Sequence, residues 1–420
     1  MKTINRREFC KLLSMSAVAY LIAPISVKAV NIPEIVVVGG GFSGSTCAKY
    51  LKLWGGDSIN VTIIESNANY ISPILSNLVL NGKKTIADLT FNYLAHSNNY
   101  KINMIHKTLQ SIDKTNRVLT LDDSSILKYD YLVLATGIDF TLVNDYDTNI
   151  IPHAWIAGEQ TNLLKEQIET MVDGDDFVMS IPKSPYRCPP GPYERACIVA
   201  DYLKNIKGFL NSKVIVLDAN ADIIVEKDTF SNAFISYGIE YIPNVTITAV
   251  TGDTKTVTYN TLLNSNNQKT AKVLNIIPDQ KSSKIIFDAE LNNGNWASVD
   301  PISYESTIAN GIYLIGDSQG TIQPKAGHIG NSEAKVCADA ILRTMNGLAL
   351  YTNPKTNSAC YSPISTTQAS WLTAVYEYDS SIKNMKLVSS GNYPKSGAPS
   401  TSNYRDMFSW STNLFQDTFL

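Results

Sequence analysis

The chain has 420 residues, a length typical of two or three domains. Hydrophobic residues make up 44% of it and charged residues 17%, a composition that excludes a largely disordered polypeptide. The net charge of −3 disfavours a nucleic-acid-binding protein, which would carry a basic excess.

The N-terminal segment has the zones of an export signal. Arg6 and Arg7 are followed by Phe9, by an apolar stretch at 12–24 and by a small-residue cleavage site near Ala29. This order is typical of a twin-arginine signal peptide, with an amphipathic first helix as the alternative. We therefore expect export by the twin-arginine machinery into the periplasm, where disulfides persist. No later apolar stretch is long enough to predict a membrane span.

The first structured segment predicts a β-α-β unit. A β-branched run at 34–38 enters a glycine-rich turn, a helical pattern follows at 45–53, and a second apolar run covers 60–65. A buried strand is expected at 129–134, and all three strands would lie parallel in one sheet.

The turn after the first strand carries a glycine fingerprint. Gly39 permits the tight turn, Gly41 allows the backbone to approach a pyrophosphate, and Gly44 allows close packing of helix on strand. Glu65 ends the next strand, where a carboxylate accepts hydrogen bonds from ribose hydroxyls, and Ser66 follows it. Together these residues predict a dinucleotide site.

Two later segments favour FAD over NAD as the dinucleotide. Ala135, Thr136 and Gly137 close the buried strand at a turn, and Gly316 and Asp317 place a carboxylate after another strand. With the glycine fingerprint, these segments resemble the two-dinucleotide-domain flavoproteins of the disulfide-reductase type. The resemblance implies that Asp317 binds the ribityl hydroxyls of the flavin.

A second α/β segment lacks the glycines of a nucleotide site. We expect a strand at 176–181, a turn at 182–192, a helix at 193–204 and a strand at 212–217. The turn contains only Gly191 and several prolines, which lack N–H groups and cannot cradle a pyrophosphate. A nicotinamide electron donor is therefore not expected.

Cys188 lies in that proline-rich turn, just before the helix. The helix dipole, together with Arg187 and Arg195, favours its thiolate and predicts a lowered pKa. Cys197 is nine residues further along, about 13 Å away if the segment is helical, which is too far for a disulfide.

The remaining cysteines offer one partner for Cys188. Cys47 and Cys337 lie on apolar helix faces and are expected to be buried core thiols. Cys360 lies in a polar segment at 352–363 that predicts an exposed, movable loop, so we pair it with Cys188. The residues alone leave open whether this bridge is redox-active or a structural tie for the C-terminal region.

The segment Tyr186–Arg195 resembles the flavoprotein subunit of flavocytochrome c sulfide dehydrogenase, a relative of sulfide:quinone oxidoreductases. The resemblance continues to the C-terminus, through 275–280, 299–301, 315–317, 324–327 and 360–362. The expected fold is α/β, with two Rossmann-like domains and a small α+β C-terminal domain. The expected boundaries are a signal peptide at 1–29, an FAD domain at 30–141 and 271–350, a second Rossmann-like domain at 142–270, and a C-terminal domain at 351–420.

The resemblance implies a redox-active disulfide between Cys188 and Cys360 beside the flavin. It also implies an acid close to that pair, Glu194, and an aromatic residue of the active-site region, Trp410. We further expect Lys325 to stabilise the reduced flavin. The alternatives are a helix-stabilising acid at Glu194, simple packing at Trp410 and a solvated lysine at Lys325.

The sequence departs from the family where a cysteine can bind the flavin covalently. The segment Ser72–Asn77 has Pro73 at that position, so FAD is expected to bind without a covalent link through this residue. Ser318 and Gln319 also replace the usual Ala-Cys pair. These departures favour a divergent relative with a different sulfur substrate.

The expected function is an exported FAD-dependent oxidoreductase that oxidises sulfide or a related small sulfur compound and passes electrons to a c-type cytochrome subunit. One alternative is a sulfide:quinone oxidoreductase, which would need an amphipathic C-terminal surface. Residues 404–420 hold few basic residues, which argues against it. Another alternative is a non-catalytic electron-transfer flavoprotein with structural cysteines. The sequence predicts no metal site.

Overall fold

The structure, a computed structural model, describes residues 32–389 and 395–420. The expected signal peptide at 1–29 lies outside the described residues. No helix within these two described ranges is long and apolar enough to cross a membrane.

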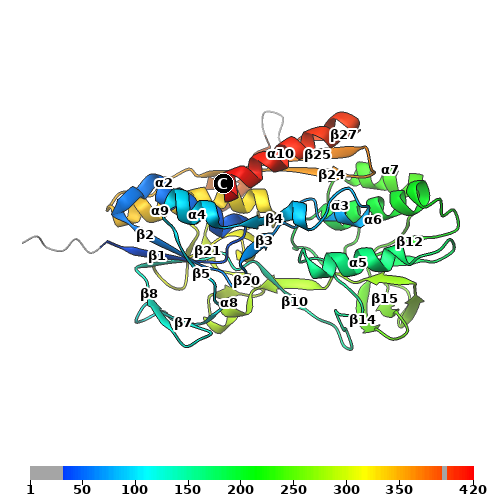
Figure 1. The fold of residues 1–420 in the computed structure, drawn as a ribbon, viewed down its shortest axis with the longest axis horizontal. Coiled ribbons are helices and arrows are strands. Elements are labelled where there is room, and N and C mark those ends of the chain that lie inside the picture. Colours follow the sequence, from blue (N-terminus) through cyan, green and yellow to red (C-terminus); the bar gives the residue numbers. More distant parts are fainter. Residues whose placement is uncertain (1–31, 390–394) are drawn as a thin grey trace, which may run out of the picture. The chain divides into compact units, whose positions relative to one another are not determined.

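A seven-stranded sheet forms the first Rossmann-like domain (Figure 1). Its order is β21-β22-β23-β9-β1-β2-β5, and the five strands from β23 to β5 run parallel. The strands are β1 (Glu34–Val38), β2 (Asn60–Ile64), β5 (Asn103–Ile105), β9 (Tyr131–Leu134), β21 (Val299–Asp300), β22 (Glu305–Ser306) and β23 (Ile312–Leu314). The β-branched runs of β1 and β2 are buried on both faces, as expected of central parallel strands.

Two helices pack together over this sheet, α2 (Phe42–Gly55) and α9 (Gly327–Met345). Cys47 and Cys337 both lie in the core between these helices and the sheet, which confirms the prediction that they are buried. The smaller elements of this half are β3 (Asn69–Ile71), β4 (Thr90–Asn92), β6 (Leu109–Asp113), β7 (Val118–Leu121), β8 (Ile126–Lys128), α3 (Asn77–Leu80), α4 (Leu94–Tyr100) and α8 (Lys284–Asp288).

A second, four-stranded parallel sheet has the order β13-β12-β11-β17. Its strands are β11 (Phe177–Ile181), β12 (Val214–Asp218), β13 (Glu240–Ile242) and β17 (Val273–Asn275), and its helices are α5 (Glu159–Glu169), α6 (Gly191–Asp201) and α7 (Lys227–Tyr237). A hairpin sheet follows, made of β14 (Thr246–Thr251), β15 (Thr256–Asn260) and β16 (Asn267–Thr270). The antiparallel pair β10 (Ile138–Thr141) and β18 (Asp279–Ser282) joins the two halves.

The C-terminal region forms a small α+β layer over both halves (Figure 1). It contains β24 (Lys355–Pro363), β25 (Ala369–Asp379), β26 (Asn384–Leu387), β27 (Lys395–Ser400) and α10 (Thr401–Phe419). Helix α10 contacts α2 of the first half, and β24 contacts α6 of the second. The predicted fold class is therefore confirmed, although the loop predicted at 352–363 is largely strand β24.

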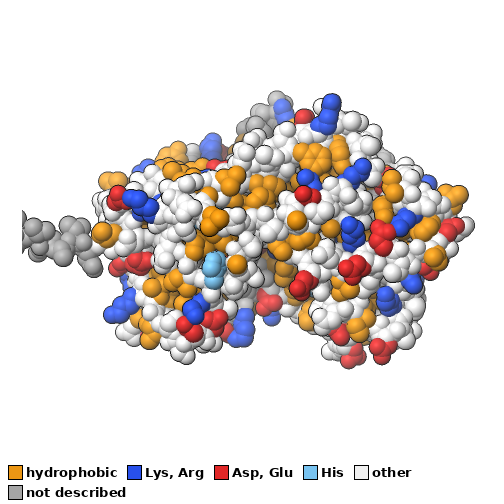
Figure 2. Space-filling view, viewed as in Figure 1, with side chains coloured by type: hydrophobic (Ala, Val, Ile, Leu, Met, Phe, Trp, Pro, Cys, Tyr) orange, Lys and Arg blue, Asp and Glu red, His pale blue; other side chains and the backbone are white. Residues whose placement is uncertain are grey.

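The surface carries no large patch of one charge sign on the face shown in Figure 2, where acidic and basic side chains alternate. This mixture agrees with the small net charge of the chain. No basic stripe of the kind that favours nucleic-acid binding is visible on this face.

Candidate functional site

A cavity of about 810 Å³ opens at the carboxyl ends of β1, β2 and β9. This edge is where ligands bind in open parallel sheets, and the volume lies in the range of small-molecule sites. Every predicted cofactor residue except Gly44 lines this cavity: Gly39, Gly41, Glu65, Ser66, Ala135, Thr136, Gly137, Gly316 and Asp317.

Backbone geometry explains the glycines at the cavity floor. Gly39 has a φ of +101°, and a Cβ there would lie 2.3 Å from the carbonyl oxygen of Ala135. A Cβ on Gly44 would lie 1.8 Å from the carbonyl oxygen of Gly39. Gly44 is therefore a packing residue between helix and strand, while Gly39 and Gly41 reach the cavity.

Two carboxylates, Glu65 and Asp317, line this cavity at separate places. Glu65 accepts hydrogen bonds from the backbone N–H of Gly40 (2.8 Å) and of Asn67 (2.9 Å), which fix it at the end of β2. Burial raises the pKa of Asp317, whose carboxylate lies 4.0 Å from the guanidinium of Arg187. The glycine floor and the two acids fit a dinucleotide with hydroxyl groups to hold.

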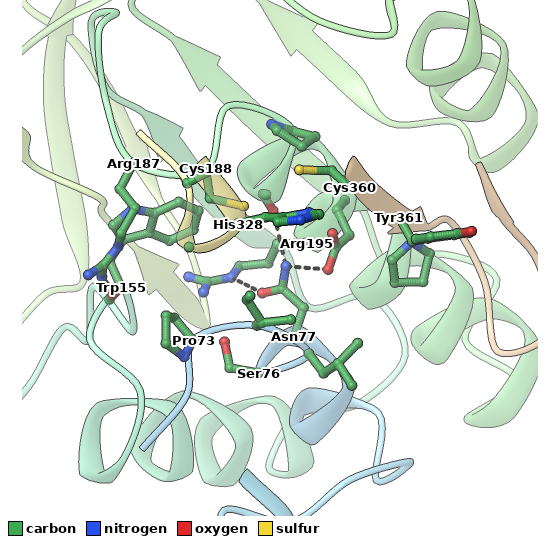
Figure 3. Close-up of a pocket in the computed structure, with 18 of the residues that line it drawn as sticks. Pro73, Ser76, Asn77, Trp155, Arg187, Cys188, Arg195, His328, Cys360 and Tyr361 are labelled. Carbon is green, nitrogen blue, oxygen red and sulfur yellow. Dashed lines mark hydrogen bonds between the residues drawn. The ribbon is translucent and has the colours of Figure 1, made fainter. Parts of the chain in front are cut away.

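A smaller, mostly apolar cavity of about 80 Å³ adjoins the large one. Both predicted cysteines line it, and their side chains point toward one another (Figure 3). The two cavities share four lining residues: Pro73, Arg187, Ala326 and Gly327. The structure thus brings Cys188 and Cys360 together next to the large cavity.

Cys188 occupies a left-handed backbone position with a φ of +57°, immediately before α6. Its N–H donates to the carbonyl of Lys325 (2.7 Å), and its carbonyl accepts from the N–H of Gly191 (2.9 Å). Burial raises the pKa of the thiol well above its usual range, and the Glu194 carboxylate adds to this rise. The predicted lowering of its pKa is wrong, because desolvation outweighs the lowering effects of the Gly191 N–H and of Arg187.

Cys360 projects from strand β24 rather than from a mobile loop. Its sulfur lies 3.8 Å from the hydroxyl of Ser358, which shares its face of the strand. Burial raises the pKa of this thiol to about 11. Within the described residues all five cysteines are free thiols, so the expected disulfide between Cys188 and Cys360 is not formed in this structure.

Glu194 stands in the first turn of α6 and lines the cysteine cavity. It accepts a hydrogen bond from the amide of Asn77 (2.8 Å), whose oxygen accepts from Nε of Arg195 (2.9 Å). Burial raises the pKa of Glu194 to about 8. A carboxyl with this pKa exchanges protons near neutral pH.

Arg195 is buried and held by backbone carbonyls. Its guanidinium donates to the carbonyls of His153 (3.0 Å) and Ala154 (2.6 Å) and lies over the ring of Trp155. Sequence reasoning placed Arg195 near the cysteine but missed Asn77, although Asn77 ends the segment in which Pro73 departs from the family.

Trp410 lines the cysteine cavity from α10, as the resemblance implies for the active-site region. Its Nε1 lies 3.4 Å from Nδ1 of His328, and that nitrogen accepts from the N–H of Ala359 (3.0 Å). His328 also lines the cavity and was not predicted. Its position one residue after Gly327, within a family-like segment, was the available signal.

Lys325 does not line either cavity. Its ammonium donates to the carbonyl of Gln319 (2.6 Å) and lies 3.6 Å from the centre of the Trp296 ring. Burial lowers its pKa to about 8. The structure therefore places Lys325 behind the site, with its charge acting on Asp317 at a distance.

The second Rossmann-like domain has its own carboxylate at the end of β12, Asp218. This residue is fully buried and accepts hydrogen bonds from the hydroxyls of Tyr193 (2.8 Å) and Tyr241 (2.9 Å). Asn220 satisfies the other carboxylate oxygen. Asp218 is thus closed to a ribose.

Family models match three segments of the chain. Residues 33–153 match the pyridine nucleotide-disulphide oxidoreductase model. Residues 161–278 match the central domain of the sulfide dehydrogenase (flavocytochrome c) flavoprotein chain. Residues 352–419 match the flavin-binding domain of flavocytochrome c sulphide dehydrogenase.

Solved structures share the fold at low sequence identity. The sulfide:quinone oxidoreductase of the hyperthermophilic bacterium Aquifex aeolicus has a TM-score of 0.74 and 17% identity, covering 92% of both chains. The NDH2 of Plasmodium falciparum in complex with NADH has a TM-score of 0.68 and 13% identity, covering 92% of this chain and 98% of that one. An NAD-dependent persulfide reductase from A. fulgidus has a TM-score of 0.59 and 16% identity, covering 92% and 77%.

The fold, the two adjoining cavities and the matched segments agree with one another. The chain is built as a flavin-dependent oxidoreductase, and it carries the central and flavin-binding domains of the flavocytochrome c sulfide dehydrogenase flavoprotein family.

Proposed function

We propose that this protein oxidises sulfide, or a related small sulfur compound, through a disulfide between Cys188 and Cys360, and passes the electrons to a c-type cytochrome. The observation that carries this proposal is the shared wall between the two cavities. Pro73, Arg187, Ala326 and Gly327 line both the cysteine cavity and the large cavity. Electrons released at the sulfurs therefore have a short path to a cofactor.

FAD is the cofactor that the large cavity fits. Gly39 and Gly41 would lie under its pyrophosphate, Glu65 would accept from the ribose, and Asp317 from the ribityl chain. Pro73 has no nucleophilic atom, so we propose that FAD is held without a covalent bond at this position. When bound, the isoalloxazine ring accepts an electron pair and releases electrons singly.

The sulfur chemistry balances with two hydrosulfide ions. The first attacks one sulfur of the disulfide, breaking the S–S bond and leaving a cysteine persulfide and a cysteine thiolate. The second attacks the outer persulfide sulfur and leaves with it as HSSH. The disulfide re-forms when the two cysteine sulfurs lose an electron pair, which a bound flavin would accept. Per cycle, two HS⁻ yield HSS⁻, one proton and two electrons, and a cytochrome partner would take up these electrons.

Glu194 is the group in the cavity suited to take that proton. Its pKa of about 8 allows it to gain and lose a proton near neutral pH. Asn77 holds one of its oxygens in place, and Arg195 in turn holds Asn77. Trp410 and His328 also line the cavity, next to Cys360.

NADH is not the electron donor in this proposal. Asp218, where the second domain would hold the adenosine ribose of NADH, is buried under Tyr193 and Tyr241. The turn before α6 supplies prolines in place of the glycines that a pyrophosphate needs.

A quinone acceptor in a membrane is disfavoured by helix α10. Its apolar side chains Met407, Leu414 and Phe419 are buried within the chain. Apart from the terminal Leu420, its exposed residues are polar or charged. An interfacial helix would turn its apolar face outward. We accordingly propose a periplasmic protein, exported by the twin-arginine route, with a water-soluble cytochrome partner.

The test is anaerobic addition of sulfide to the purified protein while the flavin absorbance is followed. We expect rapid bleaching in the wild type and a rate lowered about 100-fold or more in Cys188→Ser. Cys197→Ala is the matched control, because Cys197 is buried on α6, the helix that follows Cys188, but does not line the cavity. The proposal fails if sulfide leaves the wild-type flavin oxidised, or if NADH bleaches it rapidly.

A further inference from the structure

Glu226 is a buried carboxylate that the proposed chemistry does not use. It lies at the start of α7, and its Oε2 accepts a hydrogen bond from the hydroxyl of Ser362 (2.7 Å). Its Oε1 is buried with no hydrogen-bond partner in the part of the chain that the structure describes. A buried, unpaired carboxylate oxygen is costly, so its presence calls for an explanation.

The backbone at Glu226 is also unfavourable. Its φ of +47° is a left-handed conformation that non-glycine residues rarely adopt. The side chain does not cap the helix that it precedes. Neither helix capping nor relaxed local geometry therefore accounts for a glutamate at this position.

Strand β24 links Glu226 to the cysteine cavity. Residues two apart in a strand share one face, so Ser358, Cys360 and Ser362 lie in a row. Ser358 contacts the sulfur of Cys360, and Ser362 contacts Glu226. Glu226 as a whole is half-buried and does not itself line the cavity, whose lining includes the next residue of the strand, Pro363.

Among the described residues, no lysine or arginine forms an ion pair with Glu226. The carboxylate of Glu226 raises the pKa of two other groups, Glu194 on α6 and Cys360 on β24. Within residues 32–389 and 395–420, its one hydrogen-bond donor is the hydroxyl of Ser362, while the hydroxyl of Ser370 donates to the carbonyl of Ser362. The next residue, Lys227, is paired with Asp222 instead. Burial raises the pKa of Glu226 itself, which favours its protonated form.

We propose that Glu226 receives the proton that leaves the cysteine cavity and passes it to solvent. This inference rests on the proposed redox role of Cys188 and Cys360. Oxidation of their two thiols to a disulfide releases two electrons and two protons. Glu194 takes a proton inside the cavity, and Glu226, with Ser362 beside it, carries it to the surface.

The experiment separates proton movement from sulfide chemistry. Fully reduced holoprotein is mixed with excess ferricyanide, a one-electron oxidant, in weakly buffered solution with a pH-indicator dye. The dye reports the protons released by the thiols together with those released by the reduced flavin. The flavin absorbance reports oxidation of the flavin in the same mixture, so that its share of the protons can be subtracted. No sulfide is added, so the result does not depend on the identity of the substrate.

In Glu226→Gln we expect proton release to be slowed about tenfold, with unchanged flavin content and an unchanged number of thiols oxidised. Ser362→Ala, which keeps the carboxylate, should slow release in the same direction. The exposed Glu166→Gln on α5 is the matched control and should behave as the wild type.

Proton release in Glu226→Gln within twofold of the wild-type rate would overturn the proposal. Absence of thiol oxidation in the wild type would also overturn it, because there would be no proton to carry. If sulfide fails to bleach the flavin while proton release still depends on Glu226, the proposed substrate is wrong and the proton route stands.

Discussion

The two Rossmann-like domains share their topology but carry different residues at the carboxyl edge of the sheet. In the first, glycines after β1 open a large cavity, and Glu65 presents a carboxylate to it. In the second, the turn after β11 is rich in proline and carries Cys188, while Asp218 is closed by two tyrosines. The same edge thus forms a cavity that fits a nucleotide in one domain and presents a thiol in the other.

The largest effect is expected on flavin content, when the glycine turn of the first domain is blocked. In Gly39→Ala the new Cβ would lie 2.3 Å from a carbonyl oxygen, so we expect the purified protein to lose its flavin absorbance. Gly174→Ala is the matched control, because its φ of +99° imposes similar strain while its Cβ meets nothing. Equal flavin content in both variants would show that the glycine turn does not hold the cofactor.

A smaller effect is expected on the pH dependence of stability, and it comes from Glu194 of the second domain. The folded pKa of Glu194, about 8, exceeds its ordinary value of 4.5, so the folded state binds the extra proton between these values. Stability should therefore fall as pH rises from about 4.5 to 8, by at most about 1.4 kcal/mol per pH unit from this group.

Glu194→Gln should remove this part of the pH dependence, as measured by denaturant unfolding at several pH values. Glu333 contributes a fall in the same direction, so the informative quantity is the difference between wild type and variant. Identical slopes in the two proteins would mean that Glu194 is not protonated in the folded state.

The smallest effect is expected on the free energy of unfolding, when a tyrosine that covers Asp218 in the second domain is changed. Tyr241→Phe removes one donor to the buried Asp218, at a cost of about 1–3 kcal/mol in the free energy of unfolding. Tyr259→Phe, at a buried tyrosine that does not contact Asp218, should cost less than about 1 kcal/mol. NADH should fail to bleach the flavin in either variant. Bleaching in Tyr241→Phe would mean that the second domain retains a usable nucleotide site.

The first domain could be predicted from the sequence because its signals are local. The β-branched runs, the glycine spacing and Glu65 lie within 32 residues, and the structure has β1, α2 and β2 at those places. The predicted helix at 45–53 is longer at both ends, since glycines at its start hid the first turn.

The sequence predicted which two cysteines form the site, but not the strand and the burial that surround them. Strand β24 was mistaken for a loop because its inward residues, Thr356, Ser358 and Ser362, are small and polar. Such residues face inward here because they pack between the domains, a tertiary effect without a local signal. The pKa of Cys188 was misjudged for the same reason, since its burial comes from β24 and from the loop around Pro73.

The central claim is that Cys188 and Cys360 form a disulfide on oxidation. The most direct measurement is mass-spectrometric peptide mapping of air-oxidised protein, alkylated under non-reducing, denaturing conditions. We predict a linked peptide pair containing residues 188 and 360, which disappears on reduction, with Cys197 alkylated in both samples. Recovery of Cys188 and Cys360 as separately alkylated thiols, or linked to other cysteines, would contradict the account.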